Sequence, residues 1–378
     1  MENSSSAAPK PAPFRPDSVA GRLYGWVDER LDVGSLLALG MKKRVPEHQH
    51  SFWYYWGGIT LFFFLVMCFS GVLLLLYYRP GESSHESVRQ ITYDVKFGWL
   101  IRSAHSWGAT LMIASAFVHM FSAYFMKAYR KPREFGWWSG VVLFVLLLVF
   151  GFSGYLLPMD ELSYFATKVG LAIPQVIPGL GPWISDMIRG GPEIGSYTVS
   201  RFFALHVVIL PALFVPLMVF HLVLVQKHGM SIPESEEKKP IAERRTVPFF
   251  PNFAMKDLAM WLIALNVLAL LAALFPWGLG DAADALKPAP LDIHPEWYFM
   301  SSFETLKLFG QFISGEFGEF FGLFVFTLGL VLWTLIPLFD GESKAGVRGR
   351  LATYFGLLVL AILVVTTIIG YAVLPAVH

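Results

Sequence analysis

Four of the ten histidines lie in segments that contain no Asp, Glu, Lys or Arg. His105 and His119 bound one such segment, and His206 and His221 lie within a second. Ionisable groups inside apolar segments are costly to bury and usually have a function, for example as metal ligands. A single histidine of this kind could also bond a backbone carbonyl of a neighbouring helix, so the spacing of the four is informative.

The two histidines of each pair fall on nearly the same face of a helix. His105 and His119 are 14 residues apart, which at 100° per residue is about 1400°, roughly 40° from four full turns. His206 and His221 are 15 residues apart, which leaves a mismatch of about 60°. Because 14 residues of helix rise roughly 21 Å, each helix would carry one imidazole near each end.

Packed side by side in the same direction, the two helices would oppose His105 to His206 and His119 to His221. Two imidazoles that face each other across a bundle form the axial ligand set of a six-coordinate haem. The pairing therefore predicts two haem b groups, one iron held by His105 and His206 and the other by His119 and His221. A proton relay would also use histidines in a membrane, but it would more often include carboxylates, and neither segment contains one.

Glycines recur at the same spacing in two other apolar segments. Gly57 and Gly71 are 14 residues apart, and so are Gly140 and Gly154. A residue without a side chain lets a flat group approach the backbone, so these glycines would give clearance to the two haems. Close packing of membrane helices is the alternative explanation.

The elements that carry these residues have the properties of membrane-spanning helices. Of the 378 residues, 55% are hydrophobic and 15% are charged, compared with roughly 25% charged in soluble domains. Five uncharged stretches match or exceed the roughly 20 residues that cross a bilayer. These are 51–78, 202–226, 258–280, 320–339 and 351–378, and two more spans are expected near 103–126 and 136–157. The sequence predicts an all-α membrane protein with seven transmembrane helices, a four-helix di-haem bundle followed by three helices.

Basic residues gather on one side of this arrangement. They lie at 42–44, 127–133, 227–256 and 344–350, and all four clusters share one side if seven helices alternate in direction. The positive-inside rule places that side, here called the n side, in the cytoplasm together with the N-terminus; the opposite side is the p side. We therefore expect an integral protein of the bacterial inner membrane.

The polar segment 226–256 separates four helices from three and is the expected domain boundary. We assign 1–50 to a cytoplasmic tail and surface helix, 51–230 to the four-helix bundle and 231–378 to a three-helix region. Two p-side connections, 158–200 and 281–319, are unusually long. Long loops without a spanning element of their own are often functional lids or binding loops.

Two arginines lie close in sequence to the p-side histidines. Arg102 precedes His105 by three residues and Arg201 precedes His206 by five. Guanidinium groups bind carboxylates well, so both could pair with haem propionates; arginines of an ordinary membrane interface are the alternative. The single cysteine, Cys68, excludes an internal disulfide, and without a CxxCH motif no conventional haem c is expected.

This constellation resembles cytochrome b of the cytochrome bc1/b6f family, from about residue 24 to residue 374. Five segments resemble the b6 polypeptide: YYWGGITL (54–61), YYRP (77–80), FGWLIRSAHSWGA (97–109), GYLLPMD (154–160) and TVSRFFALH (198–206). LDIHPEWYF (291–299) carries the PEWY signature of subunit IV. The 15-residue histidine spacing and the three final helices are similar to the b6f type, with b6-like and subunit IV-like parts in one chain.

The resemblance implies the cytochrome b subunit of a quinol:cytochrome c/plastocyanin-type oxidoreductase. Quinol would be oxidised at a p-side site formed by the two long connections, with Pro158 shaping it, and electrons would pass through two b haems to quinone at an n-side site. Glu296 of PEWY is implied as the acceptor of a quinol proton, and Tyr298 as its hydrogen-bonding assistant. Pro295 and Trp297 complete the motif. A loop glutamate in a structural hydrogen bond is the alternative for Glu296.

The implied partners are a Rieske-type iron–sulfur protein, a cytochrome c or c1/f-type subunit, the quinone pool and the lipid membrane, in a homodimeric complex with Q-cycle proton translocation. A net charge of +1 gives no indication of a nucleic-acid partner. The b6 cysteine that anchors a third haem, a haem c on the n side, aligns with Tyr55, and Cys68 does not replace it. The resemblance therefore does not imply this third haem for the present chain.

Two other functions use the same histidines. A di-haem membrane anchor between quinone and a dehydrogenase or hydrogenase needs the four histidines but not PEWY. A haem-free transporter would use the histidines as a proton path. Lys227 and His228 are candidates for contact with an n-side quinone, and a solvated loop explains them as well.

Overall fold

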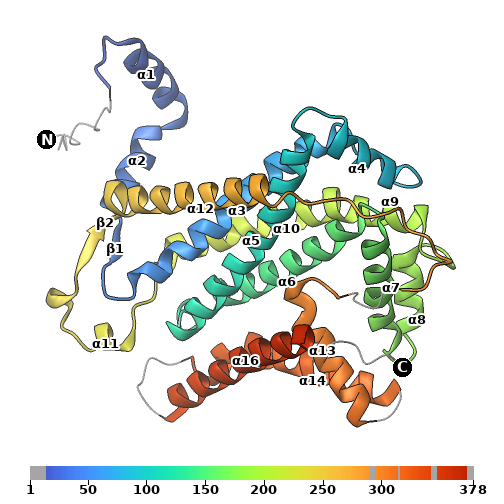
Figure 1. The fold of residues 1–378 in the computed structure, drawn as a ribbon. Helices are drawn as coiled ribbons and strands as arrows, with labels where there is room; N and C mark the ends of the chain where they lie inside the picture. Colours follow the sequence, from blue (N-terminus) through green and yellow to red (C-terminus); the bar gives the residue numbers. More distant parts are fainter. Residues whose placement is uncertain (1–13, 290–293, 314–315, 342–346, 373–378) are drawn as a thin grey trace, which may run out of the picture.

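The structure is a computed structural model that describes residues 14–289, 294–313, 316–341 and 347–372. Within these residues, seven helical segments are long and apolar enough to cross a membrane, which confirms the predicted fold class. The spanning segments contain α3 (Tyr55–Leu75), α5 (Gly98–Phe125), α6 (Glu134–Leu156), α9 (Ser196–Ala204) with α10 (Leu210–His228), α12 (Ala254–Leu274), α14 (Glu316–Thr334) and α16 (Val347–Ala372). Most of them run roughly side by side (Figure 1).

Short elements cap both ends of the spanning helices. The helices among them are α1 (Val19–Leu31), α2 (Val33–Lys42), α4 (Ser84–Tyr93), α7 (Glu161–Gln175), α8 (Gly181–Arg189), α11 (Glu234–Glu237), α13 (Trp297–Phe312) and α15 (Ile336–Phe339). Strands β1 (Arg44–Pro46) and β2 (Thr246–Pro248) pair antiparallel with Val45 opposite Val247. This small sheet joins the segment before the first span to the segment before the fifth.

The spanning helices expose apolar side chains outward. On α3, Leu65, Phe69 and Val72 are 48%, 68% and 60% exposed in the isolated chain. Large exposed apolar surfaces are rare in soluble monomers, and in a membrane lipid tails cover them. The helices are therefore held together by close packing rather than by exclusion of water.

Two helix pairs build the four-helix bundle, α3 with α5 and α6 with α10. Between them lies a buried core that includes Phe64, Met112, Leu147 and Phe214, one residue from each helix. The rings of Phe64 and Phe214 stack with centroids 4.9 Å apart. Phe64, Met112 and Leu147 each lie seven residues from both glycines or both histidines of their helix. The core layer therefore separates two layers of chemically distinctive residues.

The last three spanning helices do not form a separate group. α12 lies along α3 and α5, whereas α14 and α16 pack with α13 on the other side of α5 and α6 (Figure 1). On the n side, Tyr124 of α5 stacks on Trp333 of α14 with ring centroids 4.0 Å apart. The four-helix bundle is thus covered on two sides by the C-terminal part of the chain.

The fifth span ends earlier than its uncharged stretch, 258–280, predicts. α12 stops at Leu274, and residues 276–280 are not helical. Pro276 has no N–H and disfavours the helical conformation for the residue before it. A side chain of α5 bonds the chain where α12 ends: Trp107 Nε1 donates to the carbonyl of Phe275 at 2.8 Å. The segment is therefore fixed over the p-side end of α5.

Candidate functional site

Each of the four predicted glycines lies against one of the four predicted histidines. A Cβ on Gly71 would lie 3.4 Å from Cε1 of His105, and one on Gly154 would lie 2.7 Å from Cε1 of His206. On the n side, a Cβ on Gly57 would lie 2.9 Å from Cε1 of His119. The fourth pair is Gly140 with His221, at 3.2 Å. The space above the glycines is therefore taken first by imidazole rings, which the glycines let approach the helix backbone.

The histidines also form the two pairs that the spacing predicts. His105 lies close enough to His206, and His119 to His221, for the charged forms of the two rings to repel each other. The four side chains come from α5 and from the α9–α10 segment, and α3 and α6 supply the glycines behind them. The structure thus brings together all eight residues in two layers, one on each side of the bundle core.

Serine hydroxyls orient three of the four imidazoles. Ser70 Oγ lies 2.9 Å from Nδ1 of His105, Ser153 Oγ 2.9 Å from Nδ1 of His206, and Ser139 Oγ 2.9 Å from Nδ1 of His221. Each hydroxyl already donates its own proton to a carbonyl of its helix, those of Val66, Phe150 and Gly136. Each serine must therefore accept from Nδ1–H, which leaves the Nε2 lone pair open.

A neutral imidazole with an occupied Nδ1–H and an open Nε2 is the ligand form that haem iron requires. The residues present therefore fit two haems with two axial imidazoles each. The serines were not among the predicted site residues. A sequence signal for them exists, because three of the four glycines follow directly on a serine: Ser70–Gly71, Ser139–Gly140 and Ser153–Gly154.

His119 is the exception among the four. Its glycine, Gly57, follows Trp56 instead of a serine. Among the residues that the structure describes, no serine hydroxyl lies on the His119 ring, and the buried Nε1 of Trp56 has no hydrogen-bond partner. The two layers therefore differ in how firmly their histidines are oriented.

A π-helical turn brings His206 and His221 into register. Residues Leu205–Ile209 form this turn between α9 and α10, and the N–H of Leu210 bonds the carbonyl of Leu205. A π turn accommodates one extra residue in a helix, and Pro211, which has no N–H to donate, follows it directly. With one residue absorbed, the 15-residue spacing rotates like 14 residues, about 40° from four turns. The difference in spacing between the two pairs is thereby compensated.

The two arginines near the p-side histidines hold loops. Arg102 is buried and donates to the carbonyls of Trp277 and Gly278 at 2.8 and 2.9 Å. Arg201 bonds the carbonyl of Met187 and lies over Gly190. Both side chains fix p-side segments against the ends of the helices, and their pairing with haem propionates stays a prediction.

The two long p-side connections meet directly after α6. Asp160 forms a bridge with Ala282, in which Glu161 N donates to Asp281 O at 2.9 Å and Ala283 N donates to Met159 O at 3.1 Å. Pro158 immediately precedes this bridge. The connections also contain the helices α7, α8 and α13, which the sequence analysis did not place. The predicted loop pair is therefore a folded cap.

Glu296 lies half-buried at the N-terminal end of α13. Pro295, Trp297 and Tyr298 of its motif are described as well, while residues 291–293 lie outside the described residues. Burial raises the pKa of the Glu296 carboxyl. Burial raises the pKa of the Tyr298 phenol too, and the charge of Glu296 adds to that shift. A carboxyl of this kind can accept and release a proton closer to neutral pH.

Two tyrosines connect this carboxyl to the p-side histidine layer. Glu296 interacts electrostatically with Tyr155 of α6, which directly follows Gly154, the glycine against His206. A Cβ on Gly151, one helical turn earlier, would lie 2.8 Å from the hydroxyl oxygen of Tyr298. The Glu296 motif and the p-side histidine pair therefore lie against the same stretch of α6.

A second acidic residue, Asp257, lies beside the n-side histidine layer. It sits in the first turn of α12, its buried Oδ1 has no hydrogen-bond partner among the described residues, and a Cβ on Gly58 would collide with its carboxylate. Gly58 follows Gly57, the glycine against His119. Sequence reasoning passed over Asp257 because it directly precedes the uncharged stretch 258–280.

The other n-side candidates are placed as follows. Tyr55 is buried and stacks on Phe253 with ring centroids 4.9 Å apart, and Cys68 is exposed on α3. His228 ends α10, and its buried Nδ1 is without a hydrogen-bond partner in the described part of the chain. Lys227 precedes it.

Known proteins resemble this chain along nearly its whole length. Residues 110–282 match the family model "Cytochrome b(N-terminal)/b6/petB", and residues 282–376 match "Cytochrome b(C-terminal)/b6/petD". A cytochrome bc complex cytochrome b subunit of Chlorobaculum thiosulfatiphilum is 46% identical over 366 residues, which cover 96% of this chain and 84% of the relative.

A shorter relative and a solved structure agree with this. A menaquinol:cytochrome c reductase cytochrome b subunit of Geobacillus thermodenitrificans is 42% identical over 220 residues, 56% of this chain and 98% of the relative. A chain of a solved structure titled "Hyperthermophilic respiratory Complex III" superposes with a TM-score of 0.76 at 27% identity, covering 92% of this chain and 98% of that chain.

Proposed function

The chain belongs to the cytochrome b family, and from this premise we propose that it oxidises quinol on the p side and reduces quinone on the n side of a bc-type complex. The observation that carries the proposal is the convergence on α6, where Gly154 lies against His206 and the adjacent Tyr155 interacts with Glu296. A proton acceptor and a haem-ligating layer side by side are what quinol oxidation requires, because the reaction releases protons and electrons together.

Two haem b groups would be held by the histidine layers, one by His105 and His206 and one by His119 and His221. When bound, the haems supply one-electron transfer across the bundle. The chain's own residues orient the ligands: Ser70, Ser139 and Ser153 direct the lone pairs, and the glycines Gly57, Gly71, Gly140 and Gly154 let the imidazoles recede into the bundle. The residues at Tyr55 and Cys68 do not support a third, thioether-linked haem.

On the p side, Glu296 would accept a proton from the quinol hydroxyl. The half-buried carboxyl is poised for this because burial raises its pKa, and the N-terminal end of α13 stabilises the charge once the proton leaves. Tyr298 would position the quinol ring by hydrogen bonding, with Pro295 and Trp297 fixing the motif. The bridge between Asp160 and Ala282 would close the cap over the site and limit access of water.

On the n side, Asp257 would deliver a proton to the quinone. Its carboxyl reaches the helix surface at Gly58, next to the glycine against His119, and it has an oxygen without a partner. A buried carboxyl without a fixed partner can hold a proton and release it to a bound acceptor. His228 and Lys227 are further candidates at the cytoplasmic end of α10.

The remaining assignments follow from the same premise. One electron of quinol would pass to a Rieske-type iron–sulfur protein and a cytochrome c or c1/f-type subunit, and the other would return to quinone in a Q cycle. The n-side clusters of basic residues support a cytoplasmic N-terminus in a bacterial inner membrane, and the family supports a homodimeric complex. We further propose the division into 51–230 and 231–378.

Replacement of Glu296 by Gln tests the p-side assignment. We expect a loss of quinol oxidation by about two orders of magnitude or more, the range that general bases contribute, with an unchanged haem spectrum in the purified complex. Glu193→Gln is the matched control, because Glu193 is an exposed carboxyl in a p-side connection. If the Glu296→Gln complex oxidised quinol at the wild-type rate, Glu296 would not be the proton acceptor.

The two other functions considered have their own tests. A pyridine haemochrome assay that found two b haems per chain would exclude a haem-free transporter. A di-haem anchor would retain quinone-linked haem reduction in the Glu296→Gln complex, whereas the proposed enzyme would lose haem reduction from the p side.

A further inference from the structure

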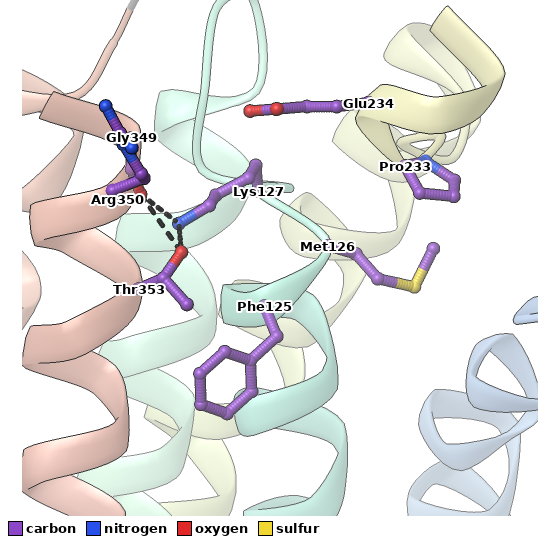
Figure 2. A pocket seen from close by; sticks show the side chains of 8 residues that line it. All are labelled: Phe125, Met126, Lys127, Pro233, Glu234, Gly349, Arg350 and Thr353. Atoms are coloured by element: carbon purple, nitrogen blue, oxygen red, sulfur yellow. Dashed lines mark hydrogen bonds between the residues drawn. The ribbon is translucent and has the colours of Figure 1, made fainter. Parts of the chain in front are cut away.

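A pocket of about 500 Å³ opens at the n-side ends of α5 and α16 (Figure 2). Its volume is within the range of about 300–1,000 Å³ that is typical of small-molecule sites. The pocket is separate from the histidine layers and from Glu296. The residues that matter for its chemistry are Phe125, Met126, Lys127, Glu234, Arg350 and Thr353.

Two cations, Lys127 and Arg350, form one wall. The Lys127 ammonium donates to Thr353 Oγ1 at 2.9 Å and to the carbonyl of Gly349 at 3.3 Å. An ammonium has three donors, so one remains for a ligand. The backbone of Lys127 is left-handed, with φ of 56°, a conformation that favours glycine or asparagine. A lysine with this backbone conformation is an outlier of the kind that clusters at functional sites.

A carboxylate, Glu234, faces this wall from the opposite side (Figure 2). Its Oε1 accepts a hydrogen bond from Arg130 Nη1 at 3.0 Å, and a carboxylate can accept several bonds. Arg130 also pairs with Asp340 at 3.0 Å, and Lys127 lies 4.0 Å from the same carboxylate. Among the described residues of this cluster, three cations therefore meet two carboxylates, which leaves one positive charge for a ligand to balance.

The position of the pocket at the end of spanning helices favours a lipid as its ligand. Phe125 and Met126 form an apolar side of the pocket at the end of a spanning helix. Directly below it on α16, Leu351, Tyr354 and Leu358 are exposed in the isolated chain, as expected for a surface that contacts acyl chains. Charged residues that border such a surface lie at the depth of phospholipid headgroups, and basic pockets between spanning helices on the cytoplasmic side are known to bind them.

We infer that the pocket binds the headgroup of an aminophospholipid such as phosphatidylethanolamine. The phosphate lies between Lys127 and Arg350, the amino group donates to Glu234, and the acyl chains run down α16. Because the C-terminal end of α5, the start of α16 and the start of α11 all contribute, a bound lipid joins the four-helix bundle to the C-terminal helices. This inference does not depend on the quinone chemistry proposed above.

Lipid retention by the purified complex tests the inference. The complex is depleted of lipid, incubated with micelles containing either phosphatidylethanolamine or phosphatidylglycerol and freed of excess, and phospholipid is then counted per chain. We expect tighter retention of phosphatidylethanolamine by the wild type. Arg350→Gln and Lys127→Met should weaken retention of both lipids about tenfold, which corresponds to the loss of one charge-assisted hydrogen bond. Glu234→Gln should abolish the preference between the two lipids.

Lys131→Met is the matched control, because Lys131 is an exposed lysine in the same connection, and it should behave like the wild type. If Lys127→Met fails to assemble, as judged by the haem spectrum, the exposed Arg350 still provides the test. Retention of both lipids by Arg350→Gln at the wild-type level would overturn the site. Equal retention of the two lipids by the wild type would overturn the amine contact, and full displacement by inorganic phosphate would show a free-phosphate site instead.

Discussion

The p-side and n-side histidine layers share their plan but differ in hydrogen bonding. Each layer sets two histidines against two glycines, and the core around Phe64 and Phe214 separates them. On the p side both Nδ1 atoms are bonded to serine hydroxyls, whereas on the n side, within the described residues, only that of His221 is. A repeated helical spacing can therefore build two layers with the same proposed ligand set and still give the two layers different hydrogen bonding.

The direction of the difference follows from ligand chemistry. An Nδ1–H that donates a hydrogen bond makes the imidazole more basic, which stabilises ferric over ferrous iron and lowers the reduction potential. The proposed p-side haem would have two such ligands and the proposed n-side haem would have one. We therefore expect the lower potential on the p side, which favours electron transfer toward the n side against the membrane potential.

Removal of one histidine should have the largest effect on either layer. In a His206→Leu complex we expect the b-haem content to halve, because the p-side iron loses an axial ligand while the n-side pair is intact. His221→Leu should halve the content as well, but with loss of the other redox component. A pyridine haemochrome assay and a redox titration measure both. A variant that kept both haems would contradict the pairing.

Added volume at the glycines should have the next largest effect, and it should differ within each layer. A Cβ at Gly154 would lie 2.7 Å from His206, whereas one at Gly71 would lie 3.4 Å from His105. We expect Gly154→Ala to displace the ring, costing about 1–3 kcal/mol, and to broaden or shift the p-side haem signal. Gly71→Ala should be tolerated.

Gly136→Ala is the control for this comparison, because nothing lies within 4 Å of the added atom on the same helix. Optical spectra and haem retention during thermal unfolding are the measurements. Equal effects at Gly154 and Gly71 would mean that the imidazole contacts do not determine haem binding.

These layers were largely predictable from the sequence, and the reasons are local. Helical periodicity alone relates His105 to His119 and Gly140 to Gly154, because residues on one helix keep a fixed angular relation. Glu296 was found differently, through the resemblance of its PEWY motif to subunit IV. The 15-residue spacing of His206 and His221 could only be corrected in the structure, where the π turn before Pro211 absorbs one residue.

Features that depend on contacts between distant segments were not predictable. Asp257 was not singled out from the sequence, because only the packing of α12 against Gly58 shows that its carboxyl is buried beside the n-side layer. The serines bond histidines that lie 35 to 82 residues away in the sequence. The position of the serines directly before the glycines is visible in the sequence. Their bonds to the histidines can be recognised only from the positions of the imidazole rings in the structure.

The pH dependence of quinol oxidation is expected to come from Glu296 on the p side and not from the n-side histidine layer. Burial raises the pKa of Glu296 above that of a free glutamate, so the carboxyl becomes protonated at a higher pH than an exposed glutamate does. Only its ionised form accepts a proton, and the quinol oxidation rate should therefore rise with pH, about tenfold per unit, below that pKa and level off above it. Rates measured from roughly pH 5 to 8 should lose this dependence in Glu296→Gln. Glu193→Gln should retain the profile, and an unchanged profile in Glu296→Gln would assign the titration to another group.

The serine bonds should have the smallest effect and give the sharpest test of the asymmetry between the layers. In Ser153→Ala the hydrogen bond to Nδ1 of His206 is lost, and in Ser139→Ala the bond to Nδ1 of His221 is lost. A neutral hydrogen bond contributes about 1 kcal/mol, which for a one-electron couple corresponds to roughly 40 mV. We expect Ser153→Ala to raise the p-side potential by about that amount and leave the n-side potential unchanged. Ser139→Ala should raise the n-side potential and leave the p-side potential unchanged. Each variant therefore serves as the control for the other in a redox titration. Since Ser139→Ala would leave the n-side pair without a serine bond, it should widen the gap between the two haems, whereas Ser153→Ala should narrow it. A gap that moved in the same direction in both variants would mean that the hydroxyls orient the rings without setting the potentials.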